Sequence, residues 1–82
     1  MWYLYIARCI DNSLYIGIST NTKERIAEHN NGTGARWFRD HGHGEIVFTE
    51  SYPDFLTAHR RELQIKKWSR QKKENLIKGL KP

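Results

Sequence analysis

The stretch Trp2-Tyr-Leu-Tyr-Ile-Ala-Arg-Cys-Ile-Asp-Asn-Ser-Leu-Tyr-Ile-Gly-Ile-Ser19 decides the fold of this 82-residue chain. Residues 2–9 and 13–19 are rich in aromatic, aliphatic and β-branched side chains, a composition typical of β-strands. Asp11 and Asn12 lie between the two runs and supply turn chemistry. The stretch therefore predicts a β-hairpin, and the length of its loop decides which side chains share a face.

Two loop lengths are compatible with this hairpin, and they differ in register. A two-residue loop places Tyr5 opposite Ile18. A three-residue loop over residues 10–12, with the final asparagine left-handed as a bulge, places Tyr5 opposite Gly17 and Ala7 opposite Tyr15. We prefer the longer loop because it separates a core face from a face that carries tyrosines. The core face then comprises Leu4, Ile6, Leu14, Ile16 and Ile18, and the other face Tyr3, Tyr5, Tyr15 and Ser19.

The rest of the chain alternates helix, loop and strand signals. Asn21 and Glu24 resemble a capping box, which predicts a helix over residues 22–31 that Gly32 or Gly34 ends. Residues 32–44 show no clear periodicity and are predicted to form a long loop. The remaining predicted elements are a strand over residues 45–52, a helix opened by Pro53 and Asp54 and extending to about Trp68, and a helix capped by Ser69 and extending through Lys78.

These elements follow the order β-β-α-β-α-α. We expect an α+β fold in which helices flank a three-stranded antiparallel sheet, and a single domain over residues 1–82, because a chain this short has room for one core. No apolar run is long enough to cross a bilayer and no targeting segment is recognisable, so no membrane role is expected. The single cysteine, Cys9, lies in an apolar strand pattern, which indicates a buried thiol and predicts a cytoplasmic protein.

The net charge of +5 is concentrated near the C-terminal end of the sequence. Residues 66–82 carry seven basic residues and one acidic residue, whereas residues 1–65 carry seven basic and eight acidic residues. A basic segment suits a polyanion, because each neutralised phosphate releases counterions, and a solvated lysine-rich helix explains it equally well. The predicted loop adds an aromatic side chain between two arginines, a pattern that suits base stacking. Together with a glycine that permits close approach, the candidate nucleic-acid-binding residues are Gly17, Arg36, Trp37, Arg39, Lys66, Lys67, Arg70, Lys72 and Lys73.

Arg25 and His29 lie four residues apart on the first predicted helix and therefore point the same way. An arginine fork can grip a phosphate, and a histidine can orient or transfer a proton. Such a pair on a helix is nevertheless more often simply solvated.

Glu62 is a stronger signal, because it falls with Phe55, Ala58 and Ile65 on the expected core-facing side of its helix. A carboxylate at the edge of a core needs a partner. A metal ion satisfies that need, and so does a structural salt bridge to Arg25 or to a nearby lysine.

Taken in order, these residues form a pattern with a known counterpart. Tyr3-Leu-Tyr5, then Tyr15-Ile-Gly17, Arg25-x-x-x-His29-Asn30 and a later helical Glu62 closely resemble the GIY-YIG nuclease domain, and most of all its small stand-alone bacterial members. A lone Tyr-Ile-Gly has little value, whereas four elements in the right order and spacing are specific. The resemblance spans most of the chain.

The resemblance implies a role for each matching position. Tyr5 and Tyr15 match the two motif tyrosines, Arg25 the phosphate-binding arginine, His29 the helix histidine, and Glu62 the carboxylate that ligates one divalent metal ion. Two departures stand out: the first motif contains Tyr-Leu-Tyr in place of Gly-Ile-Tyr, and Ile18 occupies a position where some relatives carry a lysine. The distal asparagine of some members has only a loose counterpart in Asn75.

The resemblance implies an endonuclease that uses one Mg²⁺ or Mn²⁺ ion to hydrolyse DNA in repair or processing, on a substrate that includes branched or nicked DNA. The alternative is a nucleic-acid-binding module that keeps the fold and the basic surface but has little turnover. A protein-interaction domain is the third and least favoured reading. One site makes one cut, so double-strand cleavage would need a transient dimer or two encounters, and an accessory protein is a further candidate partner.

Overall fold

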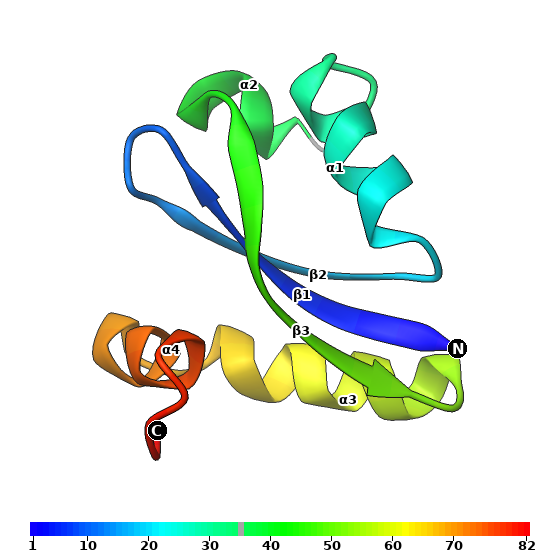
Figure 1. The fold of residues 1–82 in the computed structure, drawn as a ribbon, viewed down its shortest axis with the longest axis vertical. Helices are drawn as coiled ribbons and strands as arrows, with labels where there is room; N and C mark the ends of the chain where they lie inside the picture. The colour runs from blue at the N-terminus through cyan, green and yellow to red at the C-terminus, as the bar shows by residue number, and fades with distance from the viewer. Residues whose placement is uncertain (35) are drawn as a thin grey trace.

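A computed structural model describes residues 1–34 and 36–82, and it confirms the α+β fold. A three-stranded antiparallel sheet has the strand order β2-β1-β3 and is flanked by helices (Figure 1). The strands are β1 (Trp2–Cys9), β2 (Leu14–Ser19) and β3 (Gly44–Tyr52), and the helices are α1 (Thr22–Asn30), α2 (Trp37–His41), α3 (Phe55–Lys66) and α4 (Arg70–Ile77). In the part of the chain described, no helix is long and apolar enough to cross a membrane.

The hairpin has the three-residue loop and the register that it predicts. Tyr5 lies opposite Gly17, Ala7 lies opposite Tyr15, and Asn12 has the left-handed φ of 72° that the bulge requires. The backbone amide of Asn12 donates to the carbonyl of Cys9, which closes the turn. The tyrosines of the two strands therefore share a face, as the preferred register requires.

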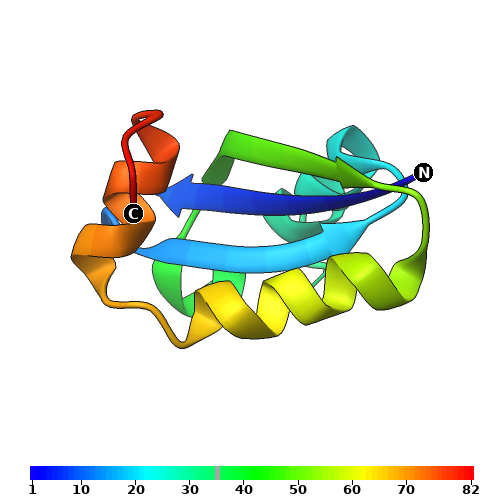
Figure 2. The same cartoon turned by 90° about the horizontal axis from the view of Figure 1, so that it is seen from below.

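The sheet separates two apolar clusters, because successive side chains of β1 point to opposite faces. Leu4, Ile6, Ile16 and Ile65 form one buried cluster, beneath α3. Tyr5, Ala7, Cys9 and Phe38 form the other, which α1 and α2 cover. Figure 1 shows α1 and α2 on one side of the sheet and α3 and α4 on the other, and Figure 2 shows α3 running alongside the outer strand β2.

Helix α1 begins where its capping signal predicts, but one of the two hydrogen bonds of the capping box has a different partner. The Asn21 side chain accepts a hydrogen bond from the backbone amide of Glu24, as in a capping box. The reciprocal partner differs, since the backbone amide of Asn21 donates to Ser19 Oγ and the Glu24 carboxylate pairs with the Asn21 side-chain amide. Gly32, with a φ of +85°, follows the helix in the left-handed conformation that favours glycine.

The segment predicted as an unbroken loop over residues 32–44 contains the short helix α2, and its residue 35 lies outside the described residues. Five residues are too few to show helical periodicity in the sequence. What holds the helix is tertiary packing, because Phe38 is buried against the tyrosine-bearing face. The prediction that Phe55 faces the core is also wrong, since its side chain is exposed at the start of α3, whereas Ala58 and Ile65 are buried.

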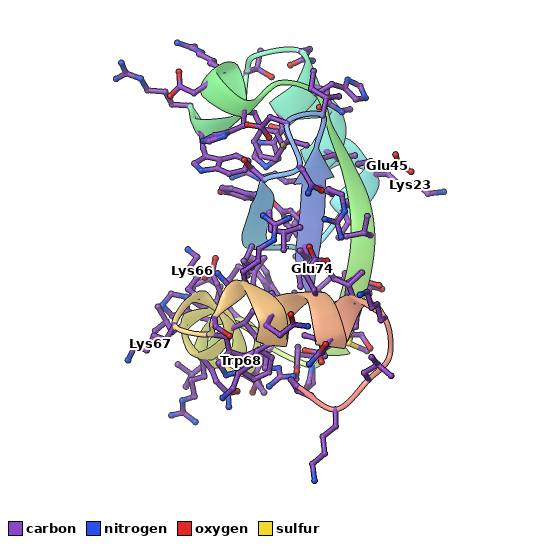
Figure 3. The ribbon with its side chains drawn as sticks, turned by 90° about the vertical axis from the view of Figure 1, so that its left-hand side faces the viewer. Lys23, Glu45, Lys66, Lys67, Trp68 and Glu74 are labelled. Carbon is purple, nitrogen blue, oxygen red and sulfur yellow. The ribbon has the colours of Figure 1, made fainter. Side chains whose placement is uncertain are left out.

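Helix α4 is fastened to the hairpin by a paired arginine and glutamate. Arg8 Nη2 donates to Glu74 Oε1 at 2.6 Å, Arg8 Nη1 donates to Glu74 Oε2 at 3.0 Å, and Arg70 Nε donates to the same carboxylate at 3.1 Å. These bonds hold the pKa of Glu74 at about 2, well below its usual value, first because Arg8 donates to the charged form. Figure 3 shows Glu74 on α4, at the side of the helix that faces the sheet.

Replacing Glu74 with glutamine is expected to lower the free energy of unfolding by about 1 kcal/mol at pH 7, since a partly buried bidentate pair is lost. The folded-state pKa is depressed, so the carboxylate stabilises the fold fully above its ordinary value of 4.5 and loses that effect as the pH falls toward about 2. Urea unfolding at pH 7 and at pH 2.5 measures both effects. Glu45→Gln, which changes an exposed carboxylate on β3, is the control. The assignment is contradicted if Glu74→Gln loses as much unfolding free energy between pH 7 and pH 2.5 as the parent protein does.

Candidate active site

Tyr5 occupies the centre of the candidate site and depends on the glycine opposite it. Its side chain is 1% exposed and lies across the sheet from Gly17. A Cβ atom at Gly17 would come within 2.6 Å of the Tyr5 hydroxyl oxygen and 2.7 Å of its Cζ, so no larger residue fits without moving the ring. The glycine of the second motif is therefore required by the tyrosine of the first.

The Tyr5 hydroxyl forms a buried hydrogen bond with His29 of helix α1, with 2.9 Å between the oxygen and Nε2. The His29 ring is 3% exposed and stacks on Phe38, with ring centroids 4.1 Å apart and planes 7° from parallel. Tyr15 meets the same imidazole edge-on at 5.3 Å. Helix α2 thus supplies the wall that holds His29 against Tyr5.

Burial shifts both members of this pair toward their neutral forms. Burial raises the pKa of Tyr5 far above its usual range, Tyr15 and Glu62 raise it further, and Arg25 lowers it. Burial also lowers the pKa of His29 below 6.5, with the nearby Arg25 charge acting in the same direction. At neutral pH the pair is therefore a phenol beside an uncharged imidazole.

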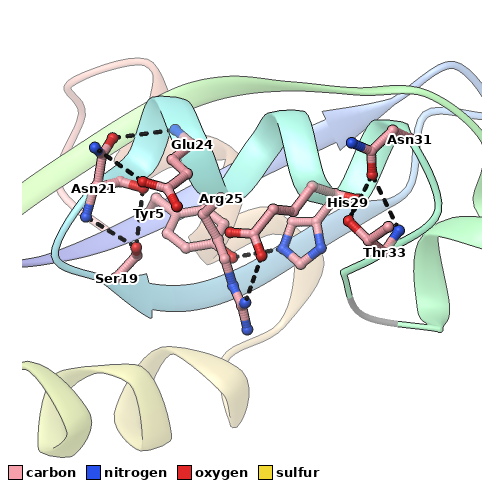
Figure 4. Close-up of polar contacts among 9 residues, drawn as sticks. Tyr5, Ser19, Asn21, Glu24, Arg25, His29, Asn31 and Thr33 are labelled. Atoms are coloured by element: carbon pink, nitrogen blue, oxygen red, sulfur yellow. Dashed lines mark hydrogen bonds and ion pairs between the residues drawn. The ribbon is translucent and has the colours of Figure 1, made fainter.

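Arg25 extends from the middle of α1 at the margin of a pocket. Its side chain is 42% exposed, and Nη1 lies 3.8 Å from Glu28 Oε2, one turn along the helix. Figure 4 shows the arginine and His29 on the same side of α1, with Tyr5 behind them. The guanidinium is accessible to an incoming anion and still lowers the pKa of the Tyr5 hydroxyl.

Glu62 lies on α3 and is 9% exposed, which bears out its anomalous position in the sequence. Its two oxygens have partners on its own helix: Lys66 Nζ is 3.3 Å from Oε2, and His59 Nδ1 is 3.0 Å from Oε1. Within residues 1–34 and 36–82, no ion pair joins this carboxylate to Arg25. The sequence left Arg25 and a nearby lysine open as structural partners of Glu62, and the structure shows the lysine, Lys66.

His59, on the same helix as Glu62, has a specific contact in the structure. Its ring stacks on Phe55, with centroids 5.4 Å apart, while Nδ1 faces the Glu62 carboxylate. The sequence signal was the spacing of three residues between His59 and Glu62, which places both on neighbouring turns of one helix face.

Arg25 and Glu62 come from helices on opposite faces of the sheet, yet both act electrostatically on the Tyr5 hydroxyl. Helix α1 covers the tyrosine-bearing face, and α3 packs against both β1 and the outer strand β2. Both helices contact β2, the edge strand that carries Gly17. The site therefore straddles the edge of the sheet.

The donor set can be tested for a divalent metal ion. Among the described residues, no three His, Cys, Asp or Glu side chains gather to form a protein cage. A single carboxylate completed by water and substrate phosphate is, however, an arrangement that Mg²⁺ commonly uses. The Lys66 ammonium beside Oε2 shows that this oxygen accepts a cation, and the Lys66 side chain is half exposed. Glu62 therefore fits a metal bound largely by water and substrate.

The candidate nucleic-acid residues do not lie on one surface. Arg36 and Arg39 are exposed around α2, but His41 covers one face of the neighbouring Trp37 ring at 3.9 Å, so this tryptophan already has a stacking partner. Figure 3 shows Lys66 and Lys67 near the junction of α3 and α4, whereas α2, which carries Trp37 and Arg39, lies on the other side of the sheet (Figure 1). On α4, Arg70 bonds Glu74, Lys72 lies over the Trp68 ring and Asn75 accepts from Gln71, while Lys73 is partly buried.

Comparison with known proteins places this geometry in a family. Residues 1–75 match the GIY-YIG catalytic domain, so the chain belongs to the GIY-YIG family. Members of this family are nucleases, are generally dependent on divalent metal ions and act on DNA.

Similar proteins carry the label UPF0213, which names no activity. A UPF0213 protein of Staphylococcus haemolyticus is 44% identical over 75 residues, which cover 92% of this chain and 92% of the relative. One of Natronomonas pharaonis is 43% identical, with 92% and 88% covered. The solution structure of a UPF0213 protein from Bacillus halodurans is 39% identical and has a TM-score of 0.61, with 95% of this chain and 84% of that chain covered.

Proposed function

We propose that this protein is a divalent-metal-dependent endonuclease that hydrolyses DNA phosphodiester bonds at the edge of β2. The observation that carries the proposal is the buried Tyr5 hydroxyl, which lies within the electrostatic influence of both Arg25 and Glu62. Those groups would supply a proton-transfer position, a phosphate ligand and a metal ligand. The family membership supports the same reaction class.

Arg25 binds the scissile phosphate in this mechanism. Its guanidinium is accessible and presents a planar fork of donors that matches two phosphate oxygens. Charge accumulates on those oxygens as water attacks, so the arginine binds the transition state more strongly than the ground state. Tyr15 lies against Tyr5, with ring centroids 6.2 Å apart, and its hydroxyl serves as a further hydrogen-bond donor to the phosphate.

The Tyr5 and His29 pair removes the proton of the attacking water. A free phenolate is scarce at neutral pH, because burial raises the pKa of Tyr5. The hydrogen bond to His29 avoids that species: as the Tyr5 oxygen takes a proton from water, its own proton passes along the hydrogen bond to Nε2 of the neutral imidazole. Tyr5 is then a relay, and His29 holds the proton.

Glu62 would hold a divalent metal ion, Mg²⁺ or Mn²⁺. The bound ion supplies Lewis-acid stabilisation of the scissile phosphate and of the leaving oxygen. His59 donates from Nδ1 to Oε1 and so fixes the orientation of the carboxylate.

The direct test is a cleavage assay across single-stranded, duplex, nicked and branched DNA with Mg²⁺, Mn²⁺ or EDTA. We expect cleavage with either metal and none with EDTA. Arg25→Ala is expected to lower the rate by about 10²-fold or more, because one transition-state contact to the phosphate is lost. Lys23→Ala removes a neighbouring charge from α1 and is the matched control.

The assay also separates the proposal from the alternative, a binding module with little turnover. Metal-independent, salt-sensitive DNA binding without cleavage of any substrate would support that module and overturn the nuclease assignment. Cleavage that is insensitive to Arg25→Ala would remove the arginine from the mechanism.

A further inference from the structure

A pocket lies beside the candidate site and shares Arg25 with it. It has a volume of about 280 Å³ and opens between the end of β2 and helix α1. The residues that line it are Trp2, Ile18, Ser19, Thr20, Asn21, Glu24, Arg25 and Glu28. None of the steps in the proposed hydrolysis uses the pocket itself.

The charges in the pocket disfavour a phosphate in its interior and favour an uncharged ligand there. Arg25 is its single cation, whereas Glu24 and Glu28 place two carboxylates in the wall. A phosphate group inside the pocket would be repelled by both carboxylates, while a phosphate at its margin would meet the guanidinium. An uncharged group with hydrogen-bond donors suits the interior, and the amino groups of nucleobases are such donors to carboxylates.

The apolar part of the lining suits a flat aromatic ligand. Trp2 is half-buried and meets the Phe55 ring edge-on at 5.1 Å, so the indole is held in place by α3. Phe55 in turn stacks on His59, which contacts the Glu62 carboxylate. This row of rings, Trp2, Phe55 and His59, connects the pocket to the position of the metal ligand. Partly exposed aromatic rings are surfaces on which unpaired bases stack.

We propose that this pocket binds one unpaired nucleobase, stacked against Trp2, next to the phosphate that Arg25 holds. Glu24 accepts from the exocyclic amino group of the base, and the Asn21 side-chain amide, 3.4 Å from Glu24 Oε2, fixes the carboxylate. A paired base inside a duplex has both faces stacked and its amino group occupied. The substrate class is therefore a single strand or an unpaired nucleotide within a larger DNA, which rests on the proposed nuclease function.

The test is a binding measurement on the Glu62→Gln protein without metal, so that it does not depend on cleavage. Fluorescence anisotropy compares three labelled 12-mers: oligo-dC, oligo-dT and an abasic chain of equal charge. We expect oligo-dC to bind more tightly than the abasic chain and, because thymine lacks the amino group, more tightly than oligo-dT. Adding Trp2→Ala should weaken oligo-dC binding by about 5-fold or more. Leu56→Ala, an exposed apolar residue of α3 outside the pocket, is the matched control.

Three further measurements separate a loss of base binding from a folding defect. Trp2→Phe should keep most of the affinity that Trp2→Ala loses, and Glu24→Gln should reduce the preference for oligo-dC over oligo-dT, with Glu45→Gln as its control. In the wild type, deoxycytidine monophosphate should shift the indole NMR signal of Trp2 and leave those of Trp37 and Trp68 unmoved. Equal affinity for oligo-dC and the abasic chain, or an unmoved Trp2 signal, would overturn the pocket. If the wild type cleaves no DNA but still binds in a base-dependent way, the nuclease proposal is overturned and the base pocket is not.

Discussion

Replacing Glu62 with glutamine is expected to lower metal-dependent DNA cleavage by about 10³-fold or more, because in the proposed mechanism the metal ion loses its carboxylate ligand. Affinity for uncleaved DNA should change little, since phosphate contacts are made by basic side chains. The measurement is a single-turnover cleavage rate with Mg²⁺, paired with a DNA-binding isotherm in EDTA.

The structure also predicts that this substitution leaves the fold intact. Glu62 pairs with His59 and with the half-exposed Lys66 on its own helix, so its neutralisation leaves the lysine free to turn toward solvent. Glu45→Gln, which changes an exposed carboxylate on β3, controls for the change in net charge. A Glu62→Gln protein that cuts as fast as the parent would remove the metal site from α3.

Replacing Tyr5 with phenylalanine is expected to reduce the cleavage rate by about 10²- to 10⁴-fold, the range attributed to positioned proton transfer. The ring and its packing remain, and only the hydroxyl that contacts His29 Nε2 is lost. Tyr3→Phe removes a hydroxyl two residues away on the same strand and is the matched control.

The proposed proton relay from Tyr5 to His29 leads to two additional predictions. His29→Gln should slow cleavage as well, and the double variant should be no slower than the slower single variant, because both belong to one proton path. The wild-type rate should also fall with acid at a pH below 6.5, since the pKa of His29 is lowered and only the neutral ring accepts a proton. Additive losses, or a rate in acid that is unchanged, would contradict the relay.

More of the fold than of the candidate site could be predicted from the sequence. The hairpin register follows from local rules, because the loop length and the alternation of Leu4, Tyr5 and Ile6 leave one arrangement that buries the apolar face. The helix caps at Asn21, Asp54 and Ser69 are equally local. Helix α2 was missed because five residues carry no period, and its stability comes from the packing of Phe38.

The five candidate catalytic residues, Tyr5, Tyr15, Arg25, His29 and Glu62, were all named from the sequence, but their grouping was not derivable from local patterns. Glu62 was anomalous on its own helix, and Arg25 and His29 shared a face of theirs. Nothing local indicated that α1 and α3, on opposite faces of the sheet, would both act on the Tyr5 hydroxyl across an edge strand. Nor did it show His59 against Glu62 or the pocket between Trp2 and Glu24.

What the sequence by itself determined is therefore the order of the longer elements, the register of the hairpin and the choice of candidate site residues. These depend on neighbours within a few positions, through alternation, capping and turn chemistry. Only the tertiary structure decided that Tyr5 is a buried phenol beside a neutral His29, that Trp37 is already stacked, and that a pocket adjoins Arg25. These features depend on burial, on the local dielectric environment and on helices that are distant in sequence. All three are established only when helices cover both faces of the sheet.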